Sequence, residues 1–205
     1  MRKSSTLLTL LLLAGFLQSA EQVEVALKFV EIDGSDYDVV KAELKAGRLG
    51  GDFEGLNMSA VTPGFWKKIQ TFPGADVLSA PKVTVLTGQQ ARIEVGQEVA
   101  FAEEFLENGD PAGPLQTRFV GLRATITAQL QPKGVGLSLD VSAVDQAGQT
   151  EVPHGTVPIF QTRALTTRVT LPEDTPAMIG GFTSDGRRTL IICQAKTLKN
   201  KDTQK

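Results

Sequence analysis

The longest regular pattern in this chain is an alternation of apolar and polar residues over residues 118–130 and 135–143. In the first segment the apolar side chains are Val120, Leu122, Ala124, Ile126, Ala128 and Leu130. In the second they are Val135, Leu137, Leu139, Val141 and Ala143. A period of two is typical of a strand with one face in a core, and Pro132-Lys133-Gly134 predicts a turn between the two segments. We therefore expect an antiparallel pair with matched apolar faces, longer than the usual strand of about five or six residues.

Further strands are expected on both sides of this pair. They cover residues 23–32, 82–87, 91–95, 163–171 and 189–195, with one more before Gly180-Gly181. Residues 82–87 and 91–95 flank a glycine-containing turn and are predicted to form a hairpin. Two stretches rich in glycine and proline, 103–116 and 145–160, are predicted to be irregular.

Two short helices are predicted near the N-terminus. Ser35 can cap a helix that starts at Asp36 and ends at Gly47. Pro63 suits the first position of a second helix, because its missing N–H has no partner to lose there. The fold class is thus mainly β, an antiparallel β-rich domain with two short N-terminal helices.

The composition excludes several classes of function. The 205 residues are 41% hydrophobic and 21% charged, as in an ordinary globular domain. The 21 basic residues are scattered and are outnumbered by 23 acidic ones, for a net charge of −2, which argues against a nucleic-acid partner. With one histidine, His154, and one cysteine, Cys193, the chain offers neither a nucleophile with its base nor a zinc cluster. We expect no catalytic residue, no metal and no cofactor.

The first twenty residues have the order of a secretory signal. Arg2 and Lys3 precede an apolar run over residues 7–17, and small residues follow up to Ala20. The run is too short to span the roughly 30 Å of a bilayer core. We expect a signal peptide over residues 1–20, one β domain over 21–197, divided into 21–74 and 75–197, and a polar tail over 198–205.

An ordered set of motifs extends from Val77 to Phe182. The motifs are Val77-Leu78-Ser79-Ala80-Pro81-Lys82-Val83, Gly88-Gln89-Gln90-Ala91-Arg92-Ile93-Glu94-Val95-Gly96, Val120-Gly121-Leu122, Pro158-Ile159-Phe160-Gln161-Thr162-Arg163 with Thr167 beyond it, and Met178-Ile179-Gly180-Gly181-Phe182. In this order and spacing they resemble the core domain of the bacterial secretins, the ring-forming outer-membrane channel proteins of type II and type III secretion and of type IV pili. The strand at residues 23–32 resembles the entry strand of the same family. The signature residues carried over have structural roles and are Pro81, Gly96, Gly121, Pro158, Arg163, Thr167, Gly180 and Gly181.

The resemblance implies a homo-oligomer in which long strands from each copy join one large shared β-barrel. The stretches 97–117 and 145–160 correspond to hairpins that project into the lumen as a gate. The implied location is the outer membrane or periplasm, with membrane association. The implied partners are a pilotin, inner-membrane secretion components and exported protein cargo. The chain departs from the family at Ala128, where a proline is usual, and after Phe182, where only residues 183–188 precede the last strand.

Two other functions remain open from the sequence. The chain could be a periplasmic or surface β module that keeps the secretin core as a structural or oligomerisation domain without a channel. It could also be an exported hydrolase that uses acids such as Asp140 and Asp145, although no motif supports catalysis.

Overall fold

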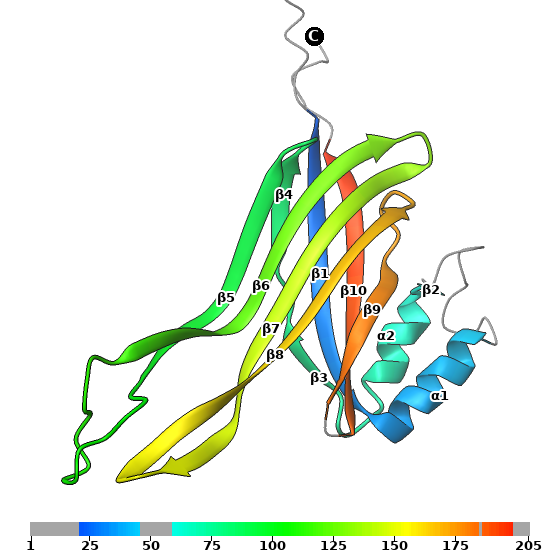
Figure 1. The fold of residues 1–205 in the computed structure, drawn as a ribbon. Helices are drawn as coiled ribbons and strands as arrows, with labels where there is room; N and C mark the ends of the chain where they lie inside the picture. Colours follow the sequence, from blue (N-terminus) through cyan, green and yellow to red (C-terminus); the bar gives the residue numbers. More distant parts are fainter. Residues whose placement is uncertain (1–20, 46–58, 185, 199–205) are drawn as a thin grey trace, which may run out of the picture.

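The computed structural model describes residues 21–45, 59–184 and 186–198. The expected signal peptide and the end of the polar tail lie outside these residues. Within them the chain folds into two antiparallel β-sheets and two helices (Figure 1). The elements are β1 (Gln22–Asp33), α1 (Gly34–Lys45), β2 (Ser59–Ala60), α2 (Pro63–Ile69), β3 (Asp76–Ser79), β4 (Lys82–Leu86), β5 (Gln90–Phe101), β6 (Gln116–Gln131), β7 (Gly134–Val152), β8 (Gly155–Leu171), β9 (Ala177–Ser184) and β10 (Arg187–Leu198).

The two sheets differ in topology. The first, called sheet A, has the strand order β2-β9-β10-β1-β3, and β4 also pairs with β1. At its centre the first strand of the domain, β1, runs antiparallel to the last strand, β10, along its whole length. The second, called sheet B, is a meander in the order β5-β6-β7-β8 and contains the long alternating strands expected from the sequence.

The main core lies between the two sheets. Leu122, Ala124 and Ile126 of β6 face Val23, Val25 and Leu27 of β1 across it, within one cluster of buried residues. The expected alternation is therefore confirmed, because the polar positions between these residues lie on the opposite face of sheet B. Burial of such side chains supplies about 25 cal/mol per Å² of apolar surface.

A smaller core lies between sheet A and the helices, which cover its outer face (Figure 1). Val40 of α1 and Phe65 of α2 pack there against Leu190 and Ile192 of β10. Ile191 and Cys193, the alternate residues of the same strand, face sheet B. β10 is thus buried on both faces, which is why its sequence is a continuous apolar run.

The predicted hairpin over residues 82–95 is wrong. β4 pairs with β1 in sheet A, whereas β5 pairs with β6 in sheet B. Val85 of β4 and Ile93 of β5 both point into the main core, so that the two strands face each other across the layers. The turn between them carries the chain from one sheet to the other, and the Gly88 N–H donates to the Ala128 carbonyl over 2.8 Å.

The stretch 145–160 is not irregular as predicted. β7 continues to Val152 and β8 begins at Gly155, with a bulge between Gln146 and Gly148 and His154 in the turn at φ 66°. The sequence there lacks alternation because neither face is buried in a core, so that backbone pairing supplies most of the contacts that hold it extended. Other differences are shifts at element ends: α1 starts at Gly34 instead of Asp36, and β5 continues to Phe101 instead of ending at Val95.

Candidate functional site

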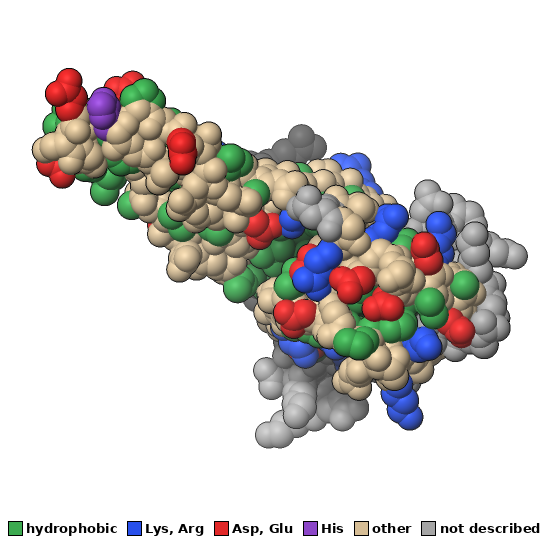
Figure 2. Space-filling model, turned by 90° about the horizontal axis from the view of Figure 1, so that it is seen from below, with side chains coloured by type: hydrophobic (Ala, Val, Ile, Leu, Met, Phe, Trp, Pro, Cys, Tyr) green, Lys and Arg blue, Asp and Glu red, His purple; other side chains and the backbone are tan. Residues whose placement is uncertain are grey.

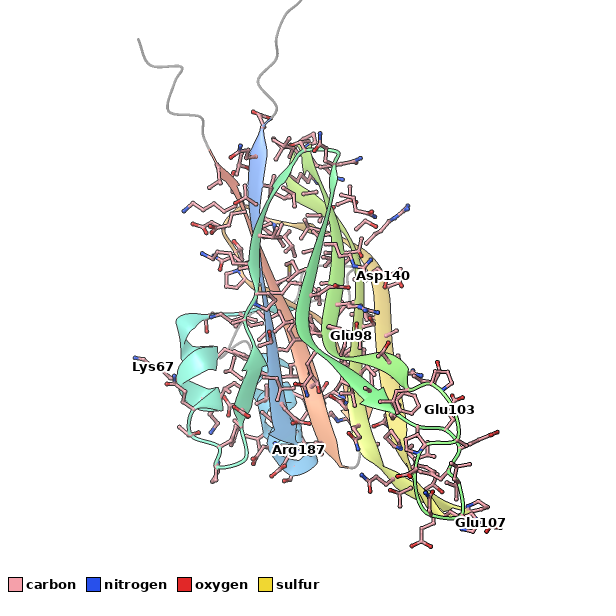
Figure 3. The ribbon with its side chains drawn as sticks, turned by 90° about the vertical axis from the view of Figure 1, so that its left-hand side faces the viewer. Lys67, Glu98, Glu103, Glu107, Asp140 and Arg187 are labelled. Atoms are coloured by element: carbon pink, nitrogen blue, oxygen red, sulfur yellow. The ribbon has the colours of Figure 1, made fainter. Side chains whose placement is uncertain are left out.

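One end of sheet B extends beyond the sandwich as an arm, made of the loop 102–115 and the hairpin 146–160 (Figures 1 and 3). The two parts touch near their tips. The Phe105 ring lies against Gly155 so closely that a Cβ at Gly155 would stand 2.4 Å from Phe105 Cδ2. The loop therefore rests on the hairpin rather than projecting separately.

Aromatic contacts hold the base of the arm. The ring centroids of Phe101 and Phe160 are 5.2 Å apart at an interplanar angle of 55°. The Arg118 guanidinium lies 5.2 Å from the centroid of the Phe160 ring and donates to Thr162 Oγ1 over 3.3 Å. These contacts join β5, β6 and β8, so the arm is tied to three strands of sheet B.

The arm is acidic. Its carboxylates are Glu103, Glu104, Glu107, Asp110 and Glu151. Neither part of the arm contains a lysine or arginine, and its one further titratable side chain is His154 at the hairpin turn. Figure 2 shows the acidic side chains and the histidine gathered at the far end of the arm. The arm thus presents a negative, water-exposed tip.

Two opposed glycines lie where the arm leaves the sandwich. Gly96 of β5 pairs directly with Gly121 of β6. A Cβ at Gly96 would stand 2.2 Å from the Val120 carbonyl oxygen, and Gly121 has φ 139°, a conformation that favours glycine. Glycine in strand interiors marks bends of this kind, and β5 and β6 bend between the sandwich and the arm (Figure 1).

The face of sheet B opposite the core is polar. The residues on it include Thr125, Thr127, Ser138, Asp140, Ser142, Thr166, Arg168 and Thr170. Figure 3 shows Asp140 and Glu98 on this side of the molecule and Lys67 of α2 on the far side. A sheet face of hydroxyls and scattered charges is suited to line a water-filled space.

Arginines hold one carboxylate on this polar face. Glu94 accepts from Arg92, and Arg123 Nε lies 2.7 Å from its Oε1. The hydrogen bond from Arg92, together with the charges of Arg92 and Arg123, lowers the pKa of Glu94 below its ordinary value. The Arg123 guanidinium also lies 4.1 Å from the centroid of the Phe119 ring, so the bend is lined by ordered side chains.

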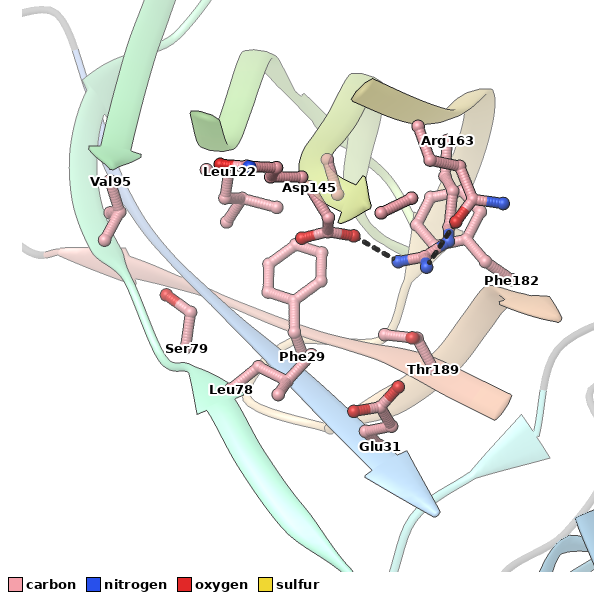
Figure 4. A pocket seen from close by; sticks show the side chains of 15 residues that line it. Phe29, Glu31, Leu78, Ser79, Val95, Leu122, Asp145, Arg163, Phe182 and Thr189 are labelled. Carbon is pink, nitrogen blue, oxygen red and sulfur yellow. Dashed lines mark hydrogen bonds and ion pairs between the residues drawn. The ribbon is translucent and has the colours of Figure 1, made fainter. Parts of the chain in front are cut away.

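A cavity of about 460 Å³ opens between the two sheets beside the bend (Figure 4). Its wall on sheet B includes one row of paired residues, namely Val95, Leu122, Ala143 and Arg163, and further residues of β6, β7 and β8. Its wall on sheet A includes Phe29, Leu78 and Phe182. Within it Arg163 Nη1 donates to Asp145 Oδ2 over 2.6 Å and Nη2 donates to Gln161 Oε1 over 3.0 Å.

The structure brings some of the signature residues together and separates others. Gly96, Gly121 and Arg163 lie around the cavity and the bend. Thr167 pairs with Leu139 higher in sheet B, and Pro158 pairs with Gln149 in the arm. Gly180 and Gly181 lie in β9, where a Cβ at Gly181 would stand 2.2 Å from the Thr189 carbonyl oxygen. Pro81 lies between β3 and β4, and its carbonyl accepts from the Leu27 N–H over 2.9 Å.

Sequence reasoning missed the residues that organise the arm. Nothing in the sequence marks Phe101, Phe105 or Arg118, since a single side chain beside an apparent loop carries no signal of its contacts. From the sequence, Asp145 is a candidate only for a hydrolytic acid together with Asp140. The two aspartates lie on opposite faces of β7, with Asp140 on the polar face and Asp145 in the cavity against Arg163, so they cannot act as a pair.

Metal clusters and membrane-spanning helices are absent from the described residues. These residues contain no group of three or more His, Cys, Asp or Glu side chains able to hold a metal ion. No helix in the part of the chain that the structure describes is long and apolar enough to cross a membrane.

The family model named Secretin, described as bacterial type II and III secretion system protein, matches residues 69–191. The chain belongs to the secretin family. A search of curated proteins gives no significant match. The matched residues run from α2 to β10 and include all of sheet B, the arm and the cavity.

Solved secretins share this fold. The type IV competence pilus secretin PilQ of V. cholerae matches with a TM-score of 0.51 at 16% identity, over 88% of this chain and 62% of that one. The GspD chain of the ETEC pilotin–secretin complex AspS–GspD matches with a TM-score of 0.53 at 13% identity, over 89% and 50%. The secretin-domain β-barrel of InvG from the Salmonella SPI-1 injectisome matches with a TM-score of 0.51 at 13% identity, over 91% and 65%. The chain therefore spans between 50% and 65% of the length of these secretin chains.

Proposed function

We propose that this chain is a component of a protein secretion or type IV pilus system and that its copies form the wall of an outer-membrane channel. Sheet B of each copy contributes four strands to one shared barrel, with the polar face toward the lumen. Residues 1–20 direct export to the periplasm or outer membrane, and exported protein passes through the lumen without any catalysed reaction.

The observation that carries this proposal is the pair of unpaired edges of sheet B. Among the described residues, β5 pairs only with β6, and β8 pairs only with β7. Exposed edges of long strands are templates for pairing with another chain. Because β5 and β8 run in opposite directions, the β8 of one copy can extend the β5 edge of the next as an antiparallel strand. Repetition of this step closes a barrel and leaves no edge.

The arm is proposed as the gate of this channel. It extends beyond the sandwich from sheet B, it is held by aromatic contacts, and its tip is acidic and exposed. Copies arranged in a ring would bring these tips toward one another, where like charges repel. A pilotin, as in the ETEC complex, and inner-membrane components are the partners proposed for assembly.

The test is assembly of the chain after removal of residues 1–20. Purified in detergent, the protein is expected to form ring particles in electron microscopy that migrate as multimers without heating in SDS. A monomer at micromolar concentration, with or without detergent, would contradict the channel and favour a β module that keeps the core without forming a pore.

A matched variant tests the gate separately. Phe105 and Pro111 form a β-bridge, so replacing residues 106–110 by two glycines shortens the loop without separating its ends. The variant is expected to form the same rings and to conduct more current in planar bilayers than the wild type. Unchanged conductance would contradict the gate and leave the barrel wall standing.

A further inference from the structure

One row of paired residues crosses sheet B from the β5 edge to the β8 edge and lines the cavity. Val95 pairs with Leu122, Leu122 with Ala143, and Ala143 with Arg163. All of these side chains point toward sheet A and line the cavity. The row begins at the β5 edge and ends at the β8 edge, so whatever pairs with β5 adds its own side chain next to Val95.

Two large apolar side chains on this face lack cover in the single chain. Val95 on the β5 edge is 46% exposed, and Ile159 on the β8 edge is 47% exposed. The bulge near this level is in β7, so the alternation of β8 is unbroken and Ile159 lies on the same face as Arg163. Leu78, which lines the cavity from sheet A, is also 51% exposed. The mouth of the cavity at the β5 edge is thus apolar and open.

Barrel geometry restricts which residue of β8 can face Val95. Strands in closed barrels tilt by roughly 35–45°, with about 4.8 Å between strands and about 3.4 Å per residue. Four strands per copy therefore accumulate a stagger of about four to six residues. The stagger must be even, because an odd shift would place core-facing residues on the other face.

The hand of the sheet fixes the direction of the stagger. Because strands twist to the right, those of a closed barrel wind around its axis as right-handed helices. Figure 1 views sheet B from its polar face, with β5 at the left and β8 at the right. With that face toward the lumen, the stagger shifts the pairing between copies in one direction. The β8 residue that lies opposite a given β5 residue of the adjacent copy is displaced toward the arm. A stagger of four residues moves the partner of Val95 from Arg163 to Ile159.

We propose that Ile159 of one copy lies directly opposite Val95 of the next and closes the mouth of the cavity. This register rests on the proposed barrel. It pairs residues 90–99 of β5 with residues 155–164 of β8, the part of β8 that projects beyond sheet A (Figure 1). A stagger of six would leave more of β5 unpaired, because β8 begins at Gly155.

Disulfide formation distinguishes the registers. The double variant Val95→Cys with Ile159→Cys is expected to give covalent multimers and to lose the monomer band on non-reducing SDS gels after heating. Directly opposed residues have Cα atoms about 4.5–5.5 Å apart, within the range of a disulfide. A register wrong by four residues would separate them by about 13 Å, which no disulfide bridges.

Two matched double variants serve as comparisons. The double variant Val95→Cys with Arg163→Cys cross-links the copies if the row continues between them without stagger. The double variant Val95→Cys with Thr167→Cys cross-links them if the stagger of four residues runs in the opposite direction. Each single variant controls for Cys193, which is buried. If the substitutions in the cavity prevent folding, Gln90→Cys with Ala164→Cys tests the same register at exposed positions on the polar face.

The outcomes separate this register from the proposed function. Rings that are cross-linked only by the Arg163 or Thr167 variant would overturn the register and leave the barrel intact. Absence of rings in the wild type would overturn the proposed function itself. Loss of the monomer band in the Ile159 variant alone is the expected result.

Discussion

Gly96 and Gly121 lie opposite each other in the β5–β6 ladder, so close that neither position has room for a Cβ atom. A Cβ at Gly121 would stand 2.3 Å from the Val95 carbonyl oxygen and 2.5 Å from Gly96 Cα. The pair lies beside the cavity and at the bend that leads into the arm. The same two residues therefore allow β5 and β6 to approach closely and to bend where the arm leaves the sandwich.

Substitution of either glycine should destabilise the fold. Gly121→Ala forces a side chain into a positive φ and against backbone, so the free energy of unfolding should fall by about 1–3 kcal/mol in urea titrations. Gly148→Ala is the control, because a Cβ there has nothing within 4 Å. Equal stability of the two variants would show that the sheet can open at the bend without cost.

Removal of the Phe160 ring should loosen the arm without unfolding the sandwich. Phe160→Ala removes the contacts with Phe101 and Arg118. Because an aromatic pair contributes about 0.5–1.5 kcal/mol, amide exchange in the arm should accelerate by about 2- to 10-fold, while exchange in β1 and β10 stays unchanged. Leu106→Ala, at an exposed position of the same arm, is the control. Uniform acceleration in both sheets would mean that the arm is not a separate unit.

The ion pair in the cavity should contribute more than an exposed pair. A double-mutant cycle with Arg163→Met and Asp145→Asn is expected to give a coupling of about 1 kcal/mol, because the Arg163 side chain is only 19% exposed. The comparison is the pair of Lys196 with Asp174, where both side chains are 51% exposed and the coupling should be under about 0.5 kcal/mol. A coupling no larger in the cavity would indicate that water screens Arg163 fully.

Burial raises the pKa of the Cys193 thiol to about 12. The thiol should therefore stay unreactive toward maleimide at pH 8 in the folded protein and react at once in denaturant. Above about pH 9 the unfolded state loses this proton and the folded state keeps it, so stability should decline as pH rises toward 12. Cys193→Ala should remove this part of the pH dependence between pH 9 and 11. An identical slope in both proteins would contradict it.

Much of the fold could be predicted from the sequence because its signals are local. The alternation in β6 and the first half of β7 gives both the strands and their core face, and the turn at Pro132-Lys133-Gly134 gives their pairing. Pro63 marks the start of α2 for a similar reason, since its restricted φ acts within a few residues. The motifs from Val77 to Phe182 identified the family.

The remaining features depend on contacts between distant segments. Val85 and Ile93 follow the pattern of a hairpin, yet they lie in different sheets because both point into one core. Residues 146–160 have no apolar period, because only backbone pairing and the rings of Phe105 and Phe160 order them. Burial of β10 on both faces requires sheet B over Ile191 and Cys193 and the helices over Leu190 and Ile192.

The core parts of the long strands, their buried faces and the family can be read from the sequence alone, because side-chain period and turn chemistry act over neighbouring residues. The division of the strands into two layers, the union of two segments in one acidic arm and the exposure of Val95 and Ile159 on opposite edges follow from tertiary contacts. Those features arise from how apolar faces meet across the core, and that packing is not encoded at any single position.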